Sequence, residues 1–304
     1  MNMYGLLFSL LAIIGWSAYP TFVSYFGGKP VQGIFGATWG TFIVAIVLSL
    51  IMQMPMLHGA NFWLAFFSGA AWAFGNVLTI FAFGMKDKAG NELGSAKAMP
   101  ISTAFQITAN VVWGVIMLGN WGPVSSKVYG FLAVIVILVG AYMTTYQEKK
   151  SAGNKQLLMK AVGVLLIAQV GYSLYGILPQ YTRGTDGLHM FLAQAMGMAA
   201  FGLILGIYEV AKNHNNIFKQ SVTYKQIFSG FFFSMAALGY LVSAQPAMLG
   251  LATGFVLSQV SIVGATVSGI IVMHTKKTQK EWLVIVIGLV LIVLAAAVTA
   301  FLKN

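Results

Sequence analysis

The fold is decided by the segment from Pro30 to Met85, which reads PVQGIFGATWGTFIVAIVLSLIMQMPMLHGANFWLAFFSGAAWAFGNVLTIFAFGM. It contains no Asp, Glu, Lys or Arg, and residues 226–275 form a second segment of the same kind. A membrane-spanning helix needs about 20 predominantly apolar residues. Each segment is therefore long enough to cross a bilayer twice.

The rest of the chain has the same character. Its 304 residues are 59% apolar or aromatic and only 8% charged, and the mean hydropathy is +0.83, whereas a soluble domain carries about 25% charged residues. We therefore predict an all-α integral membrane protein. Apolar windows of about 20 residues predict ten spans, at 3–24, 32–54, 61–85, 93–118, 127–146, 157–179, 187–210, 225–244, 248–273 and 281–302. The first window lacks the basic start and cleavage site of a signal peptide, so we interpret it as a span.

The basic residues indicate an orientation in the membrane. There are 17 Lys and Arg against 6 Asp and Glu, a net charge of +11, but they form no basic stripe, so nucleic acid is not expected as a partner. Fourteen of the 17 lie in connectors that follow odd-numbered spans. Because positive charge concentrates in cytoplasmic loops, this distribution predicts a multi-pass membrane protein with both termini outside the cell.

The two halves of the chain share short motifs in the same order. The matching pairs are Gly15-Trp-Ser-Ala-Tyr19 with Gly171-Tyr-Ser-Leu-Tyr175, Phe67-Ser-Gly69 with Phe228-Ser-Gly230, and Leu93-Gly-Ser-Ala96 with Leu249-Gly-Leu-Ala252. We interpret residues 1–147 and 157–304 as two five-helix repeats joined by a cytoplasmic linker at 148–156. Because five is odd, the second repeat enters the membrane inverted, an architecture of secondary transporters in which substrate binds between the repeats near the midplane.

No ionisable side chain lies in the middle of a predicted span. Every Asp, Glu and His falls in a connector or at a helix end, and the chain has no cysteine. The buried carboxylates and clustered ligands that membrane enzymes, metal sites and voltage sensors need are therefore missing. We expect no enzymatic activity, no metal, no other cofactor and no charged substrate.

Neutral polar and aromatic residues take the place of charges inside the spans. Intervals of three and four residues put Thr103, Gln106 and Asn110 on one helix face. The predicted substrate-binding residues are Trp16, Trp72, Asn76, Thr103, Gln106, Asn110, Tyr172, Gln194, Tyr240, Ser258 and Gln259. For each residue the alternative is a hydrogen bond to a neighbouring helix or, for Trp and Tyr, a place at the membrane interface.

This lining suits a neutral polyol such as a sugar. Sugar hydroxyls and side-chain amides both donate and accept hydrogen bonds, and aromatic faces cover the apolar C–H patches of a sugar ring. Two alternatives stay open. One is an exporter of another small neutral metabolite or drug, and the other is a membrane sugar sensor that does not transport.

Four further motifs carry a resemblance to a known family. They are Phe26-Gly-Gly-Lys-Pro-Val-Gln32, Ser68-Gly-Ala-Ala-Trp-Ala-Phe-Gly-Asn76, Ala98-Met-Pro-Ile-Ser-Thr-Ala-Phe-Gln106, and Ser243-Ala-Gln-Pro246 with Gly250-Leu-Ala-Thr-Gly-Phe-Val-Leu-Ser-Gln259. With them the chain resembles, nearly end to end, the glucose/ribose porter family of the drug/metabolite transporter superfamily, and within it the ribose uptake proteins of lactic acid bacteria. The resemblance implies ten helices and sugar uptake across a bacterial cell membrane, with ribose favoured over glucose.

The resemblance also implies coupling to the proton gradient, which the residues themselves do not indicate. Many relatives carry a Leu-Gly-Glu signature after the fourth helix, where this chain reads Leu118-Gly-Asn-Trp121. A proton carrier would then have to lie at a cavity mouth, and the candidates are Glu209, Asp186 and His189. Proton symport and facilitated diffusion both stay open, and so does the oligomeric state.

Overall fold

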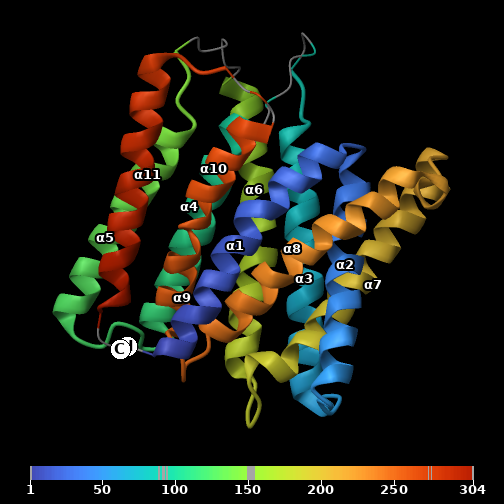
Figure 1. Cartoon of the computed structure of the whole chain (residues 1–304), viewed down its shortest axis with the longest axis horizontal. Coiled ribbons are helices and arrows are strands. Elements are labelled where there is room, and N and C mark those ends of the chain that lie inside the picture. Colours follow the sequence, from blue (N-terminus) through green and yellow to red (C-terminus); the bar gives the residue numbers. More distant parts are fainter. Residues whose placement is uncertain are drawn as a thin grey trace.

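The computed structural model describes residues 2–87, 90, 93, 95–148, 155–272, 274 and 276–302, and its regular structure is helical (Figure 1). The helices are α1 (Met3–Phe26), α2 (Pro30–Ile51), α3 (Gly59–Phe83), α4 (Ser95–Ile116), α5 (Val124–Thr144), α6 (Lys155–Ile177), η1 (Leu178–Tyr181), α7 (Gly187–Asn213), η2 (Ile217–Lys219), α8 (Ser221–Ser243), α9 (Gly250–Ser258), α10 (Ser261–Val272) and α11 (Gln279–Ala300).

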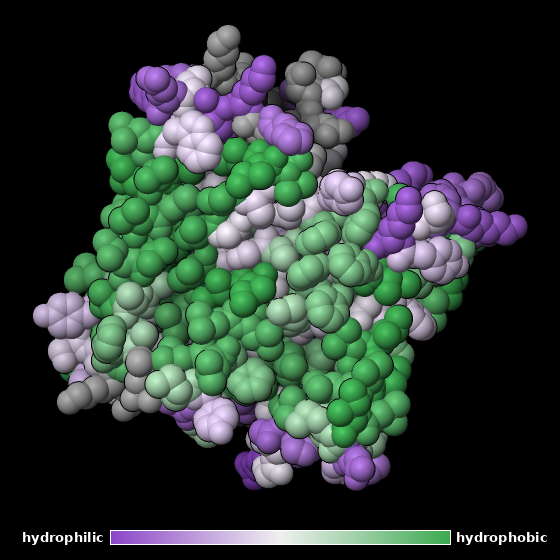
Figure 2. Space-filling view, viewed as in Figure 1, coloured by the Kyte–Doolittle hydropathy of each residue, from purple (hydrophilic) through white to green (hydrophobic). Residues whose placement is uncertain are grey.

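Ten segments within the described residues are long and apolar enough to cross a membrane. α6 with η1 makes one of them, and α9 with α10 makes another. The prediction of an all-α membrane protein with ten spans is thereby confirmed. Figure 2 shows a broad apolar surface across the face in view, with hydrophilic residues gathered above and below it.

The helices run alternately between two faces of the bundle (Figure 1). We call the face at which α1 begins and α11 ends the terminal face. The opposite face, which we call the lysine face, is the one at which α1, α3, α5, α7 and α10 end. The sequence concentrates its basic residues in the connectors that follow these helices.

Helix ends follow local sequence signals. The Asn2 side chain accepts a hydrogen bond from the backbone N–H of Gly5 and caps α1. Pro30 is the first residue of α2, where its missing N–H costs nothing. Thr278 and Glu281 form a reciprocal capping box at the start of α11.

One span is broken where the sequence gives no proline. The ninth span divides into α9 and α10 at Gln259 and Val260, where backbone bonds run to the third preceding residue, as from Val260 N–H to the Leu257 carbonyl at 3.1 Å. By contrast, α1 and α4 continue through Pro20 and Pro100. Broken helices near the membrane midplane are a feature of secondary transporters.

The packing between the two halves is reciprocal. α1 packs on α8 as α6 packs on α3, and α2 packs on α8 as α7 packs on α3. The corresponding helices of the two halves also pair with each other, α2 with α7 and α5 with α11. At the ends of the bundle in Figure 1, α5 lies beside α11 and α2 beside α7. This is the pattern that an inverted duplication produces.

Two glycines make this reciprocity visible at atomic detail. A Cβ at Gly15 would lie 2.3 Å from the backbone N of Ala236, and a Cβ at Gly171 would lie 2.4 Å from the backbone O of Ala71. Gly15 and Gly171 are matched in the sequence motifs above, and each lets its helix touch the backbone of the opposite half. The contacts are consistent with the predicted inverted repeat.

Candidate functional site

An aromatic cluster lies where the two halves meet inside the membrane. The Trp72 ring of α3 packs on Phe233 of α8 with ring centroids 4.1 Å apart. Tyr240, two turns further along α8, packs on Trp16 of α1 and on Tyr175 of α6, each at 5.5 Å. Two predicted aromatic site residues, Trp16 and Tyr240, are thus in direct contact.

Polar side chains of α4 lie along one ladder. Asn110 is fully buried and donates from Nδ2 to the Gln106 backbone carbonyl at 2.9 Å. Gln106 in turn donates from Nε2 to the Ser102 hydroxyl at 3.1 Å. The Asn110 amide oxygen has no hydrogen-bond partner among the described residues.

The Asn110 amide oxygen is one of several buried polar atoms without a hydrogen-bond partner in the part of the chain that the structure describes. Within the spans these atoms include Asn76 Nδ2, Asn110 Oδ1, Trp113 Nε1, Gln169 Oε1, Tyr175 Oη, Gln180 Oε1, Gln194 Oε1 and Tyr240 Oη. Native proteins pair most buried polar groups, because an unpaired one costs about 1–3 kcal/mol. The described part of the bundle thus holds uncharged hydrogen-bonding atoms whose capacity is not used by the protein itself.

Other predicted site residues make bonds between or within helices. Gln194 of α7 donates to the Ser68 hydroxyl at 2.8 Å, and the Tyr172 hydroxyl donates to Thr79 Oγ1 at 3.1 Å. Both bonds join the halves, which is the helix-bonding alternative for these residues. The Ser258 hydroxyl and the Gln259 side-chain amide instead donate to a carbonyl of their own span, that of Phe255.

Two cavities of about 370 Å³ each approach the interior from opposite faces, a size within the range of small-molecule sites. The terminal-face cavity is bounded by η1, the α6–α7 connector and the end of α8, and includes Gln180, Asp186 and Gln245. The lysine-face cavity lies between α1, α4, α5 and α10 and includes Thr103. Threonine and serine hydroxyls also line it, from Thr21, Ser24, Thr144, Thr145 and Thr266.

The candidate proton carriers occupy different settings. Asp186 lines the terminal-face cavity and caps α7, accepting from the His189 backbone N–H at 3.0 Å and lying 2.8 Å from His189 Nδ1. Partial burial alone raises the pKa of the Asp186 carboxyl, but the hydrogen bonds and charge of His189 and the Leu188 N–H outweigh it and lower the pKa below its ordinary value. Asp186 is therefore a carboxylate that lines the terminal-face cavity and is held by His189.

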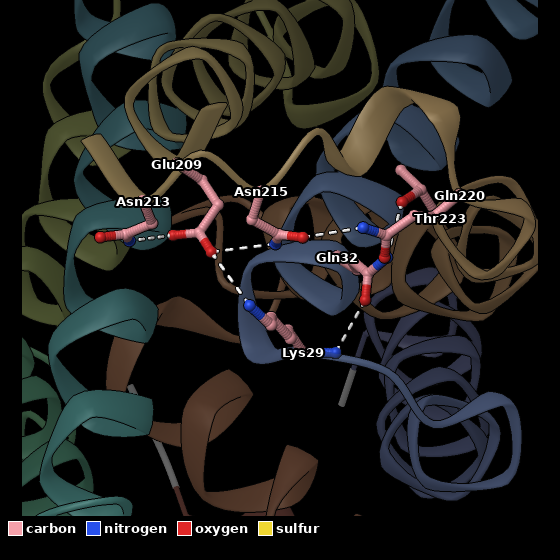
Figure 3. Close-up of polar contacts among 7 residues, drawn as sticks. All are labelled: Lys29, Gln32, Glu209, Asn213, Asn215, Gln220 and Thr223. Atoms are coloured by element: carbon pink, nitrogen blue, oxygen red, sulfur yellow. Dashed lines mark hydrogen bonds and ion pairs between the residues drawn. The ribbon is translucent and has the colours of Figure 1, made fainter. Parts of the chain in front are cut away.

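Glu209 instead belongs to a polar network at the lysine face (Figure 3). Its carboxylate lies 3.7 Å from Lys29 Nζ and accepts from Asn215 Nδ2 at 3.0 Å. The network joins the start of α2 to the end of α7 and the start of α8, through Lys29, Gln32, Glu209, Asn213, Asn215, Gln220 and Thr223. Glu209 is not among the residues that line either cavity described above.

Sequence reasoning missed three residues of this centre. Gln180 lies in η1 and lines the terminal-face cavity. The sequence places it one residue beyond the predicted span 157–179, in a connector. Phe233 is the last of three consecutive phenylalanines, which gives no signal for the one that faces inward. The third is Gly176, where a Cβ would lie 2.5 Å from Asn110 Oδ1 and 2.6 Å from Tyr240 Oη. In the sequence it does not differ from the other glycines of a chain that has 34 of them.

Comparisons with known proteins bear on this arrangement. Residues 7–302 match the family described as "Sugar transport protein". The chain is 48% identical over 303 residues, with full coverage of both chains, to a protein named "Putative ribose uptake protein RbsU" from Staphylococcus aureus strain Mu50, and 46% identical to one of the same name from Staphylococcus epidermidis.

A solved crystal structure also resembles this one. It superposes with a TM-score of 0.72 over 99% of both chains at 14% sequence identity, which supports the fold alone. The family match extends over nearly every helix of the bundle, including those that contribute the unpaired polar groups. The chain therefore belongs to the Sugar transport protein family.

Proposed function

We propose that this protein takes up a neutral monosaccharide, with ribose favoured and glucose next, across a bacterial cell membrane by alternating access. The observation that carries the proposal is the set of unpaired, uncharged polar atoms inside the bundle, of which Asn110 Oδ1 from the first half and Tyr240 Oη from the second lie within 2.6 Å of a Cβ built on Gly176. A polyol supplies many hydroxyls that donate and accept at once, so it can satisfy such atoms together. A charged substrate would find no counter-ion there.

Both halves contribute to the proposed site. Asn76 and Asn110 come from α3 and α4, whereas Tyr240 comes from α8. A sugar held between them would link residues 1–147 to residues 157–304, which are our two repeats. Trp72 and Trp16 belong to the aromatic cluster around Phe233 and Tyr240, and we propose that aromatic faces of this cluster cover the C–H surface of the sugar ring. The remaining residues that we propose for the site are Thr103, Gln106, Tyr172, Gln194, Ser258 and Gln259.

The names of the staphylococcal relatives support ribose in particular, because those proteins match the chain over its full length. Orientation follows from the basic residues. With the lysine face in the cytoplasm, both termini and the terminal-face cavity lie outside the cell. Sugar would then enter through the terminal-face cavity and leave through the lysine-face cavity.

We assign proton coupling to Asp186 and His189. They form a hydrogen-bonded ionisable pair, and Asp186 lines the cavity that would receive sugar from outside. A proton taken up on this pair neutralises the carboxylate or charges the imidazole, and either change alters the electrostatics of the cavity mouth. Glu209 is a weaker candidate because its carboxylate is held by Lys29 and two asparagines.

The test is initial uptake of labelled ribose into proteoliposomes of the purified protein, with glucose as competitor, with and without an inward proton gradient. We expect saturable ribose uptake that raises the ribose concentration inside the liposomes above the concentration outside. A protonophore should abolish this accumulation. The variant Asp186→Asn should keep saturable exchange of ribose and lose accumulation.

Each result has a separate meaning. Saturable uptake that the gradient leaves unchanged would overturn proton coupling alone. Absence of saturable flux for both sugars, in protein that is folded and correctly inserted, would overturn the proposed function.

A further inference from the structure

Gln245 lies just after the end of α8, in the motif Ser243-Ala-Gln-Pro246, which has no role in the site proposed above. Its side chain is only 8% exposed and lines the terminal-face cavity. The amide nitrogen donates to the Leu241 carbonyl at 3.2 Å and so satisfies one of the free carbonyls at the end of α8. Gln245 is thus a nearly buried polar side chain in the wall of an open cavity.

The amide oxygen of Gln245 accepts no hydrogen bond from another described residue. Because the nitrogen of this amide is turned toward the Leu241 carbonyl, the oxygen is turned away from it. The backbone here is also fixed, since the Gln245 carbonyl accepts from the N–H groups of Met248 and Gly250 at 2.9 and 3.1 Å. An acceptor is therefore held in one orientation without a donor, which is uncommon for a buried polar side chain.

Two polar side chains line the same cavity from the α6–α7 connector, those of Thr185 and Asp186. The Thr185 hydroxyl makes no hydrogen bond to another described residue. The Asp186 side chain is 59% exposed, so its carboxylate keeps acceptor capacity beyond the bonds with His189. No Lys or Arg is among the residues that line the cavity, so an anion would meet a carboxylate without a counter-charge. The cavity therefore suits a neutral ligand that donates hydrogen bonds.

We propose that the terminal-face cavity is an outer sugar-binding site, in which Gln245 recognises a sugar hydroxyl. The choice of a sugar as ligand rests on the proposed function. One hydroxyl donates to the Gln245 amide oxygen, and others bond Thr185 and the Asp186 carboxylate. A polyol fits because each of its hydroxyls can donate, and the cavity of about 370 Å³ provides the space. Neither Asn110 nor Tyr240 lines this cavity, so the outer site is separate from the site proposed above, which we call the central site.

The test measures protection of a single thiol, because the chain has no cysteine of its own. Ala247 is exposed and lines the cavity, and its backbone carbonyl accepts from Asn2 Nδ2 at 2.9 Å, a bond that Ala247→Cys keeps. The variant is reconstituted in proteoliposomes and treated from outside with a membrane-impermeant methanethiosulfonate reagent. We expect ribose to slow the reaction, with a saturable dependence on its concentration.

Further substitutions in the Ala247→Cys background identify which site the protecting sugar occupies. Gln245→Met removes the amide at similar side-chain volume, and the loss of one hydrogen bond should raise the ribose concentration for half-maximal protection about two- to tenfold. Thr185→Val should shift it in the same direction, and its hydroxyl has no bond within the described structure whose loss could disturb folding. Tyr240→Phe alters the central site and should leave this concentration unchanged.

The matched control is Ala60→Cys. Ala60 is also an exposed alanine, at the start of α3 on the terminal face, and it lines neither cavity described above. Its thiol should react at the same rate with and without ribose. This control separates occupancy of the cavity from a general effect of sugar on the reagent or on the terminal face.

Three results would overturn the inference while sugar transport stands. They are no protection of Ala247→Cys at ribose concentrations that saturate uptake, equal protection of Ala60→Cys, and protection that Tyr240→Phe shifts but Gln245→Met and Thr185→Val do not. Protection without saturable flux would overturn the proposed function and leave the outer site in place. Absence of both flux and protection would overturn both.

Discussion

Replacing Tyr240 by phenylalanine should stabilise the empty protein while it weakens sugar binding. Tyr240 is 2% exposed, and its ring packs on Trp16, Tyr175 and Phe255 at 5.5, 5.5 and 5.7 Å. Phenylalanine keeps all three ring contacts and removes only the hydroxyl, which has no partner within the described structure. The substitution therefore separates one polar atom from the packing around it.

The expected magnitude follows from that hydroxyl. A buried polar group without a partner costs about 1–3 kcal/mol, so its removal should raise the apparent melting temperature by about 2–4 °C for each kcal/mol recovered. With sugar bound, the same hydroxyl makes a hydrogen bond with a net value of about 0.5–1.5 kcal/mol. Its loss should weaken ribose binding by about two- to tenfold.

The assay is thermal unfolding of purified protein in detergent, followed by tryptophan fluorescence with and without ribose at one protein concentration. Tyr172→Phe is the matched control, because the Tyr172 hydroxyl donates to Thr79 at 3.1 Å. That variant should melt below the wild type. If Tyr240→Phe also melts below the wild type, or responds to ribose as strongly as the wild type does, the reasoning from the unpaired hydroxyl is refuted.

Three further predictions concern the framework around the site. Gln32→Ala should lower the melting temperature by several degrees, because the buried amide makes three hydrogen bonds of about 1 kcal/mol each. Gly15→Ala and Gly171→Ala should each reduce the yield of folded protein, since their Cβ atoms would lie 2.3 and 2.4 Å from backbone atoms, and a marked difference between the two would count against equivalent positions in an inverted repeat. Asp186→Asn should lower thermal stability at neutral pH. Since the folded-state pKa of Asp186 is lowered, that deficit should disappear as the pH falls below about 4, and a deficit independent of pH would exclude a role for its charge.

The ten spans could be predicted from the sequence because each depends on a local property. About 20 apolar residues are needed for a crossing, and helix ends then followed signals such as Pro30 and the Thr278 capping box. The break between α9 and α10 was not predicted. It occupies only Gln259 and Val260, and a hydropathy average over a whole span does not register two residues.

The site residues stay a prediction, and only part of what defines them is a local property of the sequence. The spacing of Gln106 and Asn110 on one helix is a property of that helix alone. Whether a polar side chain is paired depends instead on the other half of the chain, as for Tyr172 with Thr79, whose partner is 93 residues away. No local pattern distinguishes Tyr172 from Tyr240, although the first hydroxyl is bonded and the second is unpaired.

The unpaired atoms also suggest how a sugar could be coupled to movement of the halves. Asn110 lies in the first half, whereas Tyr175 and Tyr240 lie in the second, and no described side chain bonds the unpaired oxygens to one another. A ligand with one hydroxyl can make only a few of these hydrogen bonds. A polyol has several hydroxyls at fixed spacing, so it can bond both halves together and favour the conformation in which they enclose it, because a ligand shifts a conformational equilibrium by its difference in affinity for the two states. On this argument the substrate's number of hydroxyls matters as much as its size, since the free energy that closes the site comes from hydrogen bonds that the empty protein cannot make for itself.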